Sequence, residues 1–144
     1  MKRLFFLCLT LLLLVGCGSQ EGKPAWIGVY ALDRGEYNFH FGETTDKTTA
    51  VGIIKVEDDT DLAKEANTIL QNVEKTIEEY GTFMVNSGHS YNLELNGFHT
   101  HHALVIEEPG RYAFVTERDP ADNGFGVYTL FHQPLGPVEA YLVD

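Results

Sequence analysis

Hydrophobic and polar positions alternate along most of the chain after residue 25, which is the pattern of strands with one buried face. Turn-forming Gly, Pro, Asn and Asp residues separate these runs at intervals of roughly ten residues. The first two runs are joined by four turn-like residues, so we expect them to form a hairpin. The runs predict strands at 26–32, 37–41, 50–56, 82–85, 91–95, 103–107, 111–117, 126–132 and 138–143.

One segment has the period of an amphipathic helix instead. Acidic residues at 58–61 suit an N-cap and first turn, and Gly81 suits a C-terminal stop. We therefore predict one helix over about 61–80. Its apolar stripe consists of Leu62, Ala66, Ile69, Leu70, Val73, Ile77 and Tyr80.

Together these elements predict a mostly β fold. Regularly spaced strands favour an antiparallel β-sandwich or barrel, with the amphipathic helix as an insertion that covers one end or edge. The alternative is an α+β sheet with the helix packed on one face. In a chain of 144 residues, we expect residues 25–144 to form a single β-rich domain.

The N-terminus has the organisation of a signal peptide. Lys2 and Arg3 precede a nearly continuous apolar run over 4–15, which is too short to span a membrane. The next motif, Leu14-Val15-Gly16-Cys17, resembles the lipobox of bacterial lipoproteins. The resemblance implies that residues 1–16 are removed and that Cys17 is lipid-modified, with 17–24 as a tether. An ordinary secretory signal cut near Gly16 or Gly18 is the alternative.

A lipidated Cys17 would place the protein in the bacterial cell envelope, with the lipid bilayer as its first partner. Two or more acyl chains hold a protein stably on a membrane, whereas one chain does so only marginally. Gly18 after the cysteine resembles the outer-membrane sorting pattern. In a bacterium with two membranes, this favours the periplasmic face of the outer membrane over the inner membrane.

Charge and cysteine content exclude several functions. The chain has 21 acidic and 10 basic residues, a net charge of −11, and removal of 1–16 leaves 21 against 8, or −13. Nucleic-acid binding needs clustered Lys and Arg, so we expect no nucleic-acid partner. Cys8 lies in the signal and Cys17 would carry lipid. The mature protein would then lack a thiol for a disulfide, a cysteine-ligated zinc or a nucleophile.

Three of the six histidines lie within four residues. On an extended strand His99 and His101 share one face, spaced to chelate one ion, and His102 points to the other. Neutral imidazole is a good ligand for Zn²⁺ and Cu²⁺. The candidate metal ligands are therefore His99, His101, His102 and, as the preferred third ligand, His89, with His40, His132 and Glu117 as possible additions.

Two other interpretations of this segment stay open. The histidines can form a polar strand end with solvated or backbone-bonded rings, or a pH-dependent contact, since imidazole titrates near physiological pH.

A second resemblance concerns residues 107–117, which contain Pro109-Gly110-Arg111-Tyr112. This segment resembles the Pro-Gly-x-Tyr strand of cupredoxin-like and related extracytoplasmic sandwiches. Together with the histidines just upstream, it is similar to small periplasmic metal-homeostasis lipoproteins. The resemblance implies a cupredoxin-like or immunoglobulin-like sandwich that handles metal. With Cys17 lipidated, the mature chain has no free cysteine for the thiolate ligand of a blue-copper site, which disfavours electron transfer.

These observations lead to one main hypothesis and two rivals. We expect an envelope lipoprotein that binds a zinc-class or copper-class metal for sequestration, sensing or delivery, with envelope or metal-transport proteins as partners. It would need no organic cofactor and would not be an enzyme. The first rival is a non-catalytic envelope adaptor without metal. The second is a metal-dependent hydrolase with Glu94 or Glu117 as general base.

Overall fold

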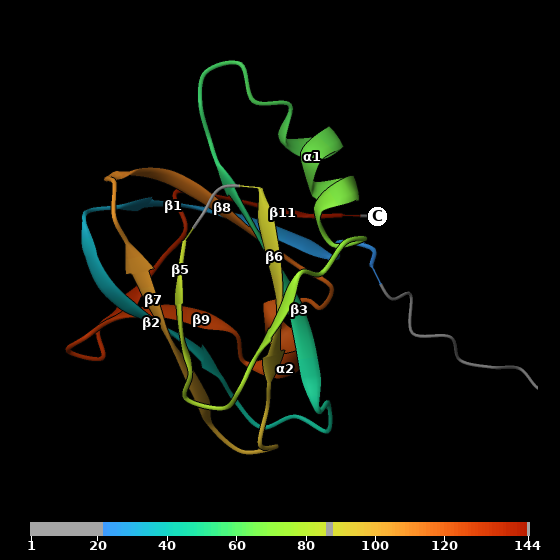
Figure 1. Cartoon of the computed structure of the whole chain (residues 1–144), viewed down its shortest axis with the longest axis vertical. Coiled ribbons are helices and arrows are strands. Elements are labelled where there is room, and N and C mark those ends of the chain that lie inside the picture. Colours follow the sequence, from blue (N-terminus) through green and yellow to red (C-terminus); the bar gives the residue numbers. More distant parts are fainter. Residues whose placement is uncertain (1–21, 86–87, 144) are drawn as a thin grey trace, which may run out of the picture.

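Two β-sheets pack face to face in the computed structural model, which describes residues 22–85 and 88–143 (Figure 1). The prediction of a mostly β sandwich is thus confirmed. The six-stranded sheet has the order β11 (Glu139–Leu142), β1 (Trp26–Leu32), β8 (Gly110–Thr116), β3 (Thr48–Lys55), β6 (His89–Glu94) and β4 (Lys75–Ile77). The five-stranded sheet has the order β10 (Pro134–Leu135), β9 (Gly126–Thr129), β2 (Gly35–Phe41), β7 (Thr100–Ile106) and β5 (Thr82–Met84).

The pairing is antiparallel except at one edge of each sheet, where β4–β6 and β5–β7 are parallel. The sandwich is therefore mostly antiparallel, with one parallel pair at an edge of each sheet. The consecutive strands β4 and β5 belong to different sheets, and the chain passes between them through residues 78–81. Tyr80 adopts a left-handed backbone conformation there, with φ at 60°.

The hairpin expected from β1 and β2 is wrong. β1 lies between β11 and β8 in one sheet, whereas β2 lies between β9 and β7 in the other. The inward side chains of both strands, such as Tyr30 and Phe39, meet in the core between the sheets. The alternating pattern identifies which side chains are buried. It does not show whether two strands pair within one sheet or face each other from different sheets, because both arrangements give the same pattern.

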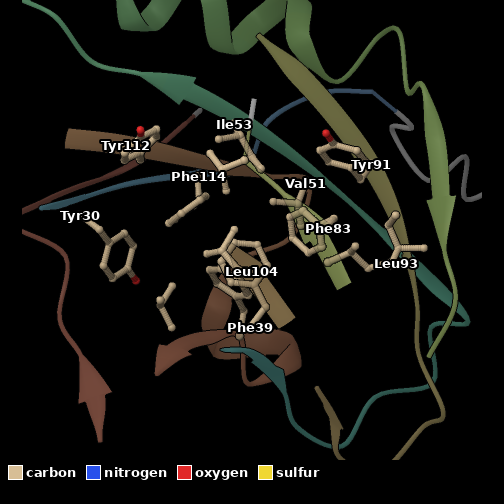
Figure 2. Packing of buried hydrophobic residues seen from close by; sticks show 14 of the residues in the cluster. Tyr30, Phe39, Val51, Ile53, Phe83, Tyr91, Leu93, Leu104, Tyr112 and Phe114 are labelled. Carbon is tan, nitrogen blue, oxygen red and sulfur yellow. The ribbon is translucent and has the colours of Figure 1, made fainter. Parts of the chain in front are cut away.

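The core between the sheets is rich in aromatic residues (Figure 2). Phe39 of β2 packs edge-to-face on Phe114 of β8, with ring centroids 4.7 Å apart. A second cluster lies on the other side of the six-stranded sheet, beneath the helix α1 (Leu62–Ile69). Ala113 and Val115 of β8 belong to this second cluster, so β8 is buried on both faces.

The helix is shorter than predicted. It begins after Asp61, whose carboxylate accepts a hydrogen bond from Lys64 N, and it ends at Leu70. The expectation of helix to residue 80 is wrong because Lys75–Ile77 form the edge strand β4, which buries Ile77 between the sheets. An isolated helix is only marginally stable in water, so tertiary contacts determine whether such a segment forms a helix or a strand. Here pairing with β6 and burial of Ile77 favour the strand.

A second helix, α2 (Pro120–Asn123), lies between β8 and β9, among the turn-forming residues that separate these strands. It ends at Gly124, which has φ at 64° and lies against Gly42.

The predicted signal peptide 1–16 and Cys17 lie outside the described residues. Within 22–85 and 88–143, no helix has the length and apolar character needed to cross a membrane.

Candidate functional site

Four histidines gather on the outer face of the five-stranded sheet, and we call them the histidine cluster. His40 of β2 and His101 of β7 are direct cross-strand partners. His99 precedes β7 by one residue, and His132 comes from the connection between β9 and β10. Three separate segments of the chain therefore bring these four imidazoles together.

The rings of the histidine cluster lie in contact or near contact. The His40 centroid is 4.7 Å from that of His101 and 5.4 Å from that of His99, which stacks nearly parallel to it. The His132 centroid is 6.2 Å from that of His101. Tyr128 of β9 meets His40 edge-on at 5.5 Å. Each of the four rings thus neighbours at least one other imidazole.

The environment of the cluster disfavours protonation. Burial lowers the pKa of His40, and the nearby His101 and His99 lower it further, against an opposing effect of the Gly124 backbone. Burial likewise lowers the pKa of His101, followed by the effects of His132 and His99. No carboxylate is among the groups that shift either pKa. The lowered pKa values favour the neutral form of His40 and His101, and neutral imidazole is the form that binds metals.

One ring nitrogen of the cluster is buried without a partner. Among the described residues, no hydrogen bond of normal geometry reaches Nδ1 of His40. A buried polar atom without a partner carries a free-energy cost that a ligand at this atom would remove.

Two tight turns position the outer members of the cluster. Before β7, the Asn96 side chain accepts a 3.0 Å bond from Phe98 N and donates a 3.3 Å bond to the His99 carbonyl. After β9, His132 itself adopts φ at 57° and donates its backbone N–H to Thr129 O at 3.0 Å. His99 and His132 are both exposed, so their side chains are free to turn.

His102 has a different role from its neighbour. Its side chain is fully buried on the inner face of β7, and its Nε2 lies 2.9 Å from the Glu94 carbonyl. This placement agrees with the predicted opposite directions of His101 and His102. It also separates His102 from the histidine cluster by the thickness of the sheet.

His89 and Glu117 also lie away from the cluster. His89 belongs to β6 of the six-stranded sheet, and its Nδ1 is 2.5 Å from the Glu74 carboxylate. Glu117 follows β8, and its carboxylate accepts a 3.1 Å hydrogen bond from Ala50 N. Among the candidates, the structure therefore brings together His40, His99, His101 and His132 but not His89, His102 or Glu117.

The sequence pointed only weakly to His40 and His132. The alternation of β2 placed His40 opposite Phe39 and Phe41, but not beside His101, because cross-strand register is a property of the folded sheet. Within the predicted strand 126–132, no sequence signal singles out Tyr128. Its position two residues after the start of β9, next to His40, follows from the β2–β9 pairing.

The cluster is not a formed metal site as it stands. Within the described ranges, no three His, Cys, Asp or Glu side chains are arranged to hold an ion. Two imidazoles on one tetrahedral zinc, at about 2.0–2.1 Å from nitrogen to metal, place their centroids about 5 Å apart. The separations in the cluster bracket that value, but the rings stack and tilt against one another instead of converging. Metal binding would therefore require the rings to turn.

Comparisons with known proteins do not assign the cluster a role: no protein-family model, curated protein or solved structure matches this chain.

Proposed function

We propose that this protein is a lipid-anchored envelope protein that binds a divalent transition metal of the zinc or copper class through the histidine cluster. The observation that carries this proposal is the convergence of four imidazoles from three segments, with neighbouring centroids 4.7–6.2 Å apart.

The donor set fits such a metal. Imidazole nitrogen is a good ligand for zinc and copper, and the lowered pKa values of His40 and His101 reduce the competition of protons with the metal at these two rings. His40 and His101 would form the fixed half of the site because paired strands hold their backbones. The exposed His99 and His132 would complete it by rotation of their side chains.

The position of the cluster suits reversible loading. It lies on an outer sheet face, so an ion can reach it from solvent, and the net charge of −11 attracts cations to the whole molecule. Both properties favour sequestration, sensing or delivery of the metal over chemistry on a substrate.

Metal titration of the purified full-length protein tests the proposal. We expect about one Zn²⁺ or Cu²⁺ ion to bind with a Kd of about 10 μM or tighter by calorimetry. The double variant His40→Ala/His101→Ala should weaken binding at least tenfold because it removes the fixed half of the site.

The matched control is His89→Gln, which alters a histidine on the other sheet and should leave the affinity unchanged. The proposal is overturned by wild-type binding no tighter than about 0.1 mM, since one or two ordinary surface imidazoles could account for it. Equal binding by wild type and the double variant would overturn it as well.

A second function, that of an adaptor, is favoured by the apolar residues beside the cluster. Phe98 and Phe131 precede His99 and His132 directly, and their exposed fractions are 73% and 85%. Large exposed apolar side chains mark protein-interaction sites when they occur together. Envelope proteins that co-purify with the wild type, but not with a Phe98→Ser/Phe131→Ser variant, would support the adaptor function, whether or not metal binds.

The membrane anchor is a separate part of the proposal and rests on the lipobox at residues 14–17. Mass spectrometry of the mature N-terminal peptide should find Cys17 as the first residue with attached acyl chains. Cys17→Ser should release the protein from the membrane fraction or block its processing. An unmodified mature N-terminus that begins elsewhere would exclude lipidation.

A further inference from the structure

A cleft opens at the edge of the sandwich, and none of the four histidines of the cluster lines it. Its volume is about 460 Å³, and residues of β1, β10, β11 and the loop around α2 line it. β11 and β10 are edge strands of the two sheets, so the cleft lies where the sandwich is open. The lining residues with chemical interest are Trp26, Tyr30, Asp119, Phe125, Leu135 and Leu142.

Aromatic rings form much of the cleft wall. The Trp26 indole meets Phe125 edge-on, with ring centroids 5.7 Å apart. It also lies across Gly28 on the inner face of β1, where any side chain on residue 28 would collide with it. The fold thus holds the indole in place and presents an aromatic wall to whatever enters the cleft.

Tyr30 adds a polar atom that the fold leaves unused. Only 4% of this residue is exposed, at one side of the core in Figure 2, and burial raises its pKa to about 12. Within residues 22–85 and 88–143, its hydroxyl takes part in no hydrogen bond. Because Tyr30 lines the cleft, its hydroxyl is available to a polar group of a ligand.

Asp119 supplies a carboxylate to the same cleft. One of its oxygens accepts a 2.9 Å hydrogen bond from Ala121 N at the start of α2, which fixes the direction of the side chain. Asp119 is the only charged residue that lines the cleft within the described part of the chain. The charge of the site therefore selects for cations.

We propose that this cleft binds a small organic cation with an aromatic ring, of the arylalkylamine class. The ring would pack against Trp26 and Phe125, and the ammonium group would face the Asp119 carboxylate and donate to the Tyr30 hydroxyl. Cations are attracted to the faces of aromatic rings and to carboxylates. The aromatic residues and Asp119 in the lining of the cleft therefore favour the same ligand.

Intrinsic fluorescence reports directly on this site because Trp26 is the only tryptophan of the chain. The probes are phenethylamine and phenylpropionate, which share a ring and a short chain but carry opposite charges. With the full-length protein, we expect phenethylamine to change the Trp26 emission saturably with a Kd of about 1 mM or tighter. Phenylpropionate should bind at least tenfold more weakly.

Two charge variants test the role of Asp119. Asp119→Asn keeps a side-chain oxygen to cap α2 but removes the charge, and should weaken phenethylamine binding about tenfold. The matched control Asp122→Asn removes a charge from the same short helix outside the cleft and should leave the Kd unchanged.

Two results would overturn the proposal. One is the absence of a saturable change in emission with phenethylamine. The other is equal affinity for both probes together with no effect of Asp119→Asn, which would identify the cleft as an apolar groove without preference for cations.

Discussion

His101 and His102 are adjacent in β7 but face opposite sides of the five-stranded sheet. His101 lies against His40 on the outer face, whereas His102 is fully buried beside Phe41 and bonded to the Glu94 carbonyl. The two positions therefore have different surroundings, and under the proposed function they have different roles. Substitutions at 101 should affect ligand binding, and substitutions at 102 should affect stability.

His102→Ala should destabilise the fold by about 2–4 kcal/mol, because it leaves a cavity and a buried carbonyl without its partner. Urea unfolding followed by circular dichroism measures the change. His99→Ala removes an exposed imidazole and should alter the free energy of unfolding by no more than about 0.5 kcal/mol. Equal effects of the two variants would show that His102 does not support the core.

The histidines should also make the fold sensitive to acid. In the folded state the pKa values of His40, His101 and His102 are lowered, mainly by burial. The unfolded chain therefore binds more protons as the pH falls below about 6.5, the ordinary histidine pKa. Their contribution to stability is complete above that pH and declines as the pH falls towards the lowered values.

We thus expect a smaller free energy of unfolding at about pH 5.5 than at about pH 7.5. His40→Ala/His101→Ala should flatten this dependence, while His89→Gln should preserve it. A free energy of unfolding that is constant or rises on acidification would contradict the assignment.

At the level of elements, α1 depends on a close approach to β3. A Cβ atom on Gly52 would lie 2.5 Å from Cγ2 of Ile69, so the helix reaches the sheet only because position 52 has no side chain. This contact seals the second apolar cluster beneath α1.

Gly52→Ala should therefore destabilise the protein by about 1–2 kcal/mol, because Ile69 or the whole helix must move outward. Gly35→Ala is the matched control, since nothing lies within 4 Å of its Cβ position. It should be neutral or slightly stabilising through the lower entropy of the unfolded chain. Urea denaturation of the two variants compares them, and a neutral Gly52→Ala would rule out tight packing at this point.

For the molecule as a whole, the proposed metal binding would be linked to stability. An ion that binds only the folded protein at 100 times its Kd stabilises it by about 2.7 kcal/mol. Since the histidine cluster joins β2, β7 and the β9–β10 connection, only the folded sheet assembles it.

Excess Zn²⁺ or Cu²⁺ should raise the melting temperature of the wild type but not that of His40→Ala/His101→Ala. Differential scanning calorimetry with and without the ion provides the measurement. A similar shift in both proteins would place the bound ion outside the cluster.

The sequence by itself determined which side chains face inward and which face outward on the main strands. Alternation predicted a mostly β sandwich, the opposite directions of His101 and His102, and the position of His40 on the face opposite Phe39 and Phe41. These features depend on neighbours within one strand, where the two-residue period is set by backbone geometry. The anchor at Cys17 and the binding of metal remain predictions.

Only the tertiary structure decided which strands are neighbours. It placed β1 and β2 in different sheets, turned residues 75–77 from helix into an edge strand, and set His40 beside His101. It also selected His132 over His89 as a member of the cluster. Each of these outcomes depends on contacts between residues far apart in the chain. The local sequence pattern cannot predict them, because every strand pairing that buries the same faces has the same alternation of hydrophobic and polar residues.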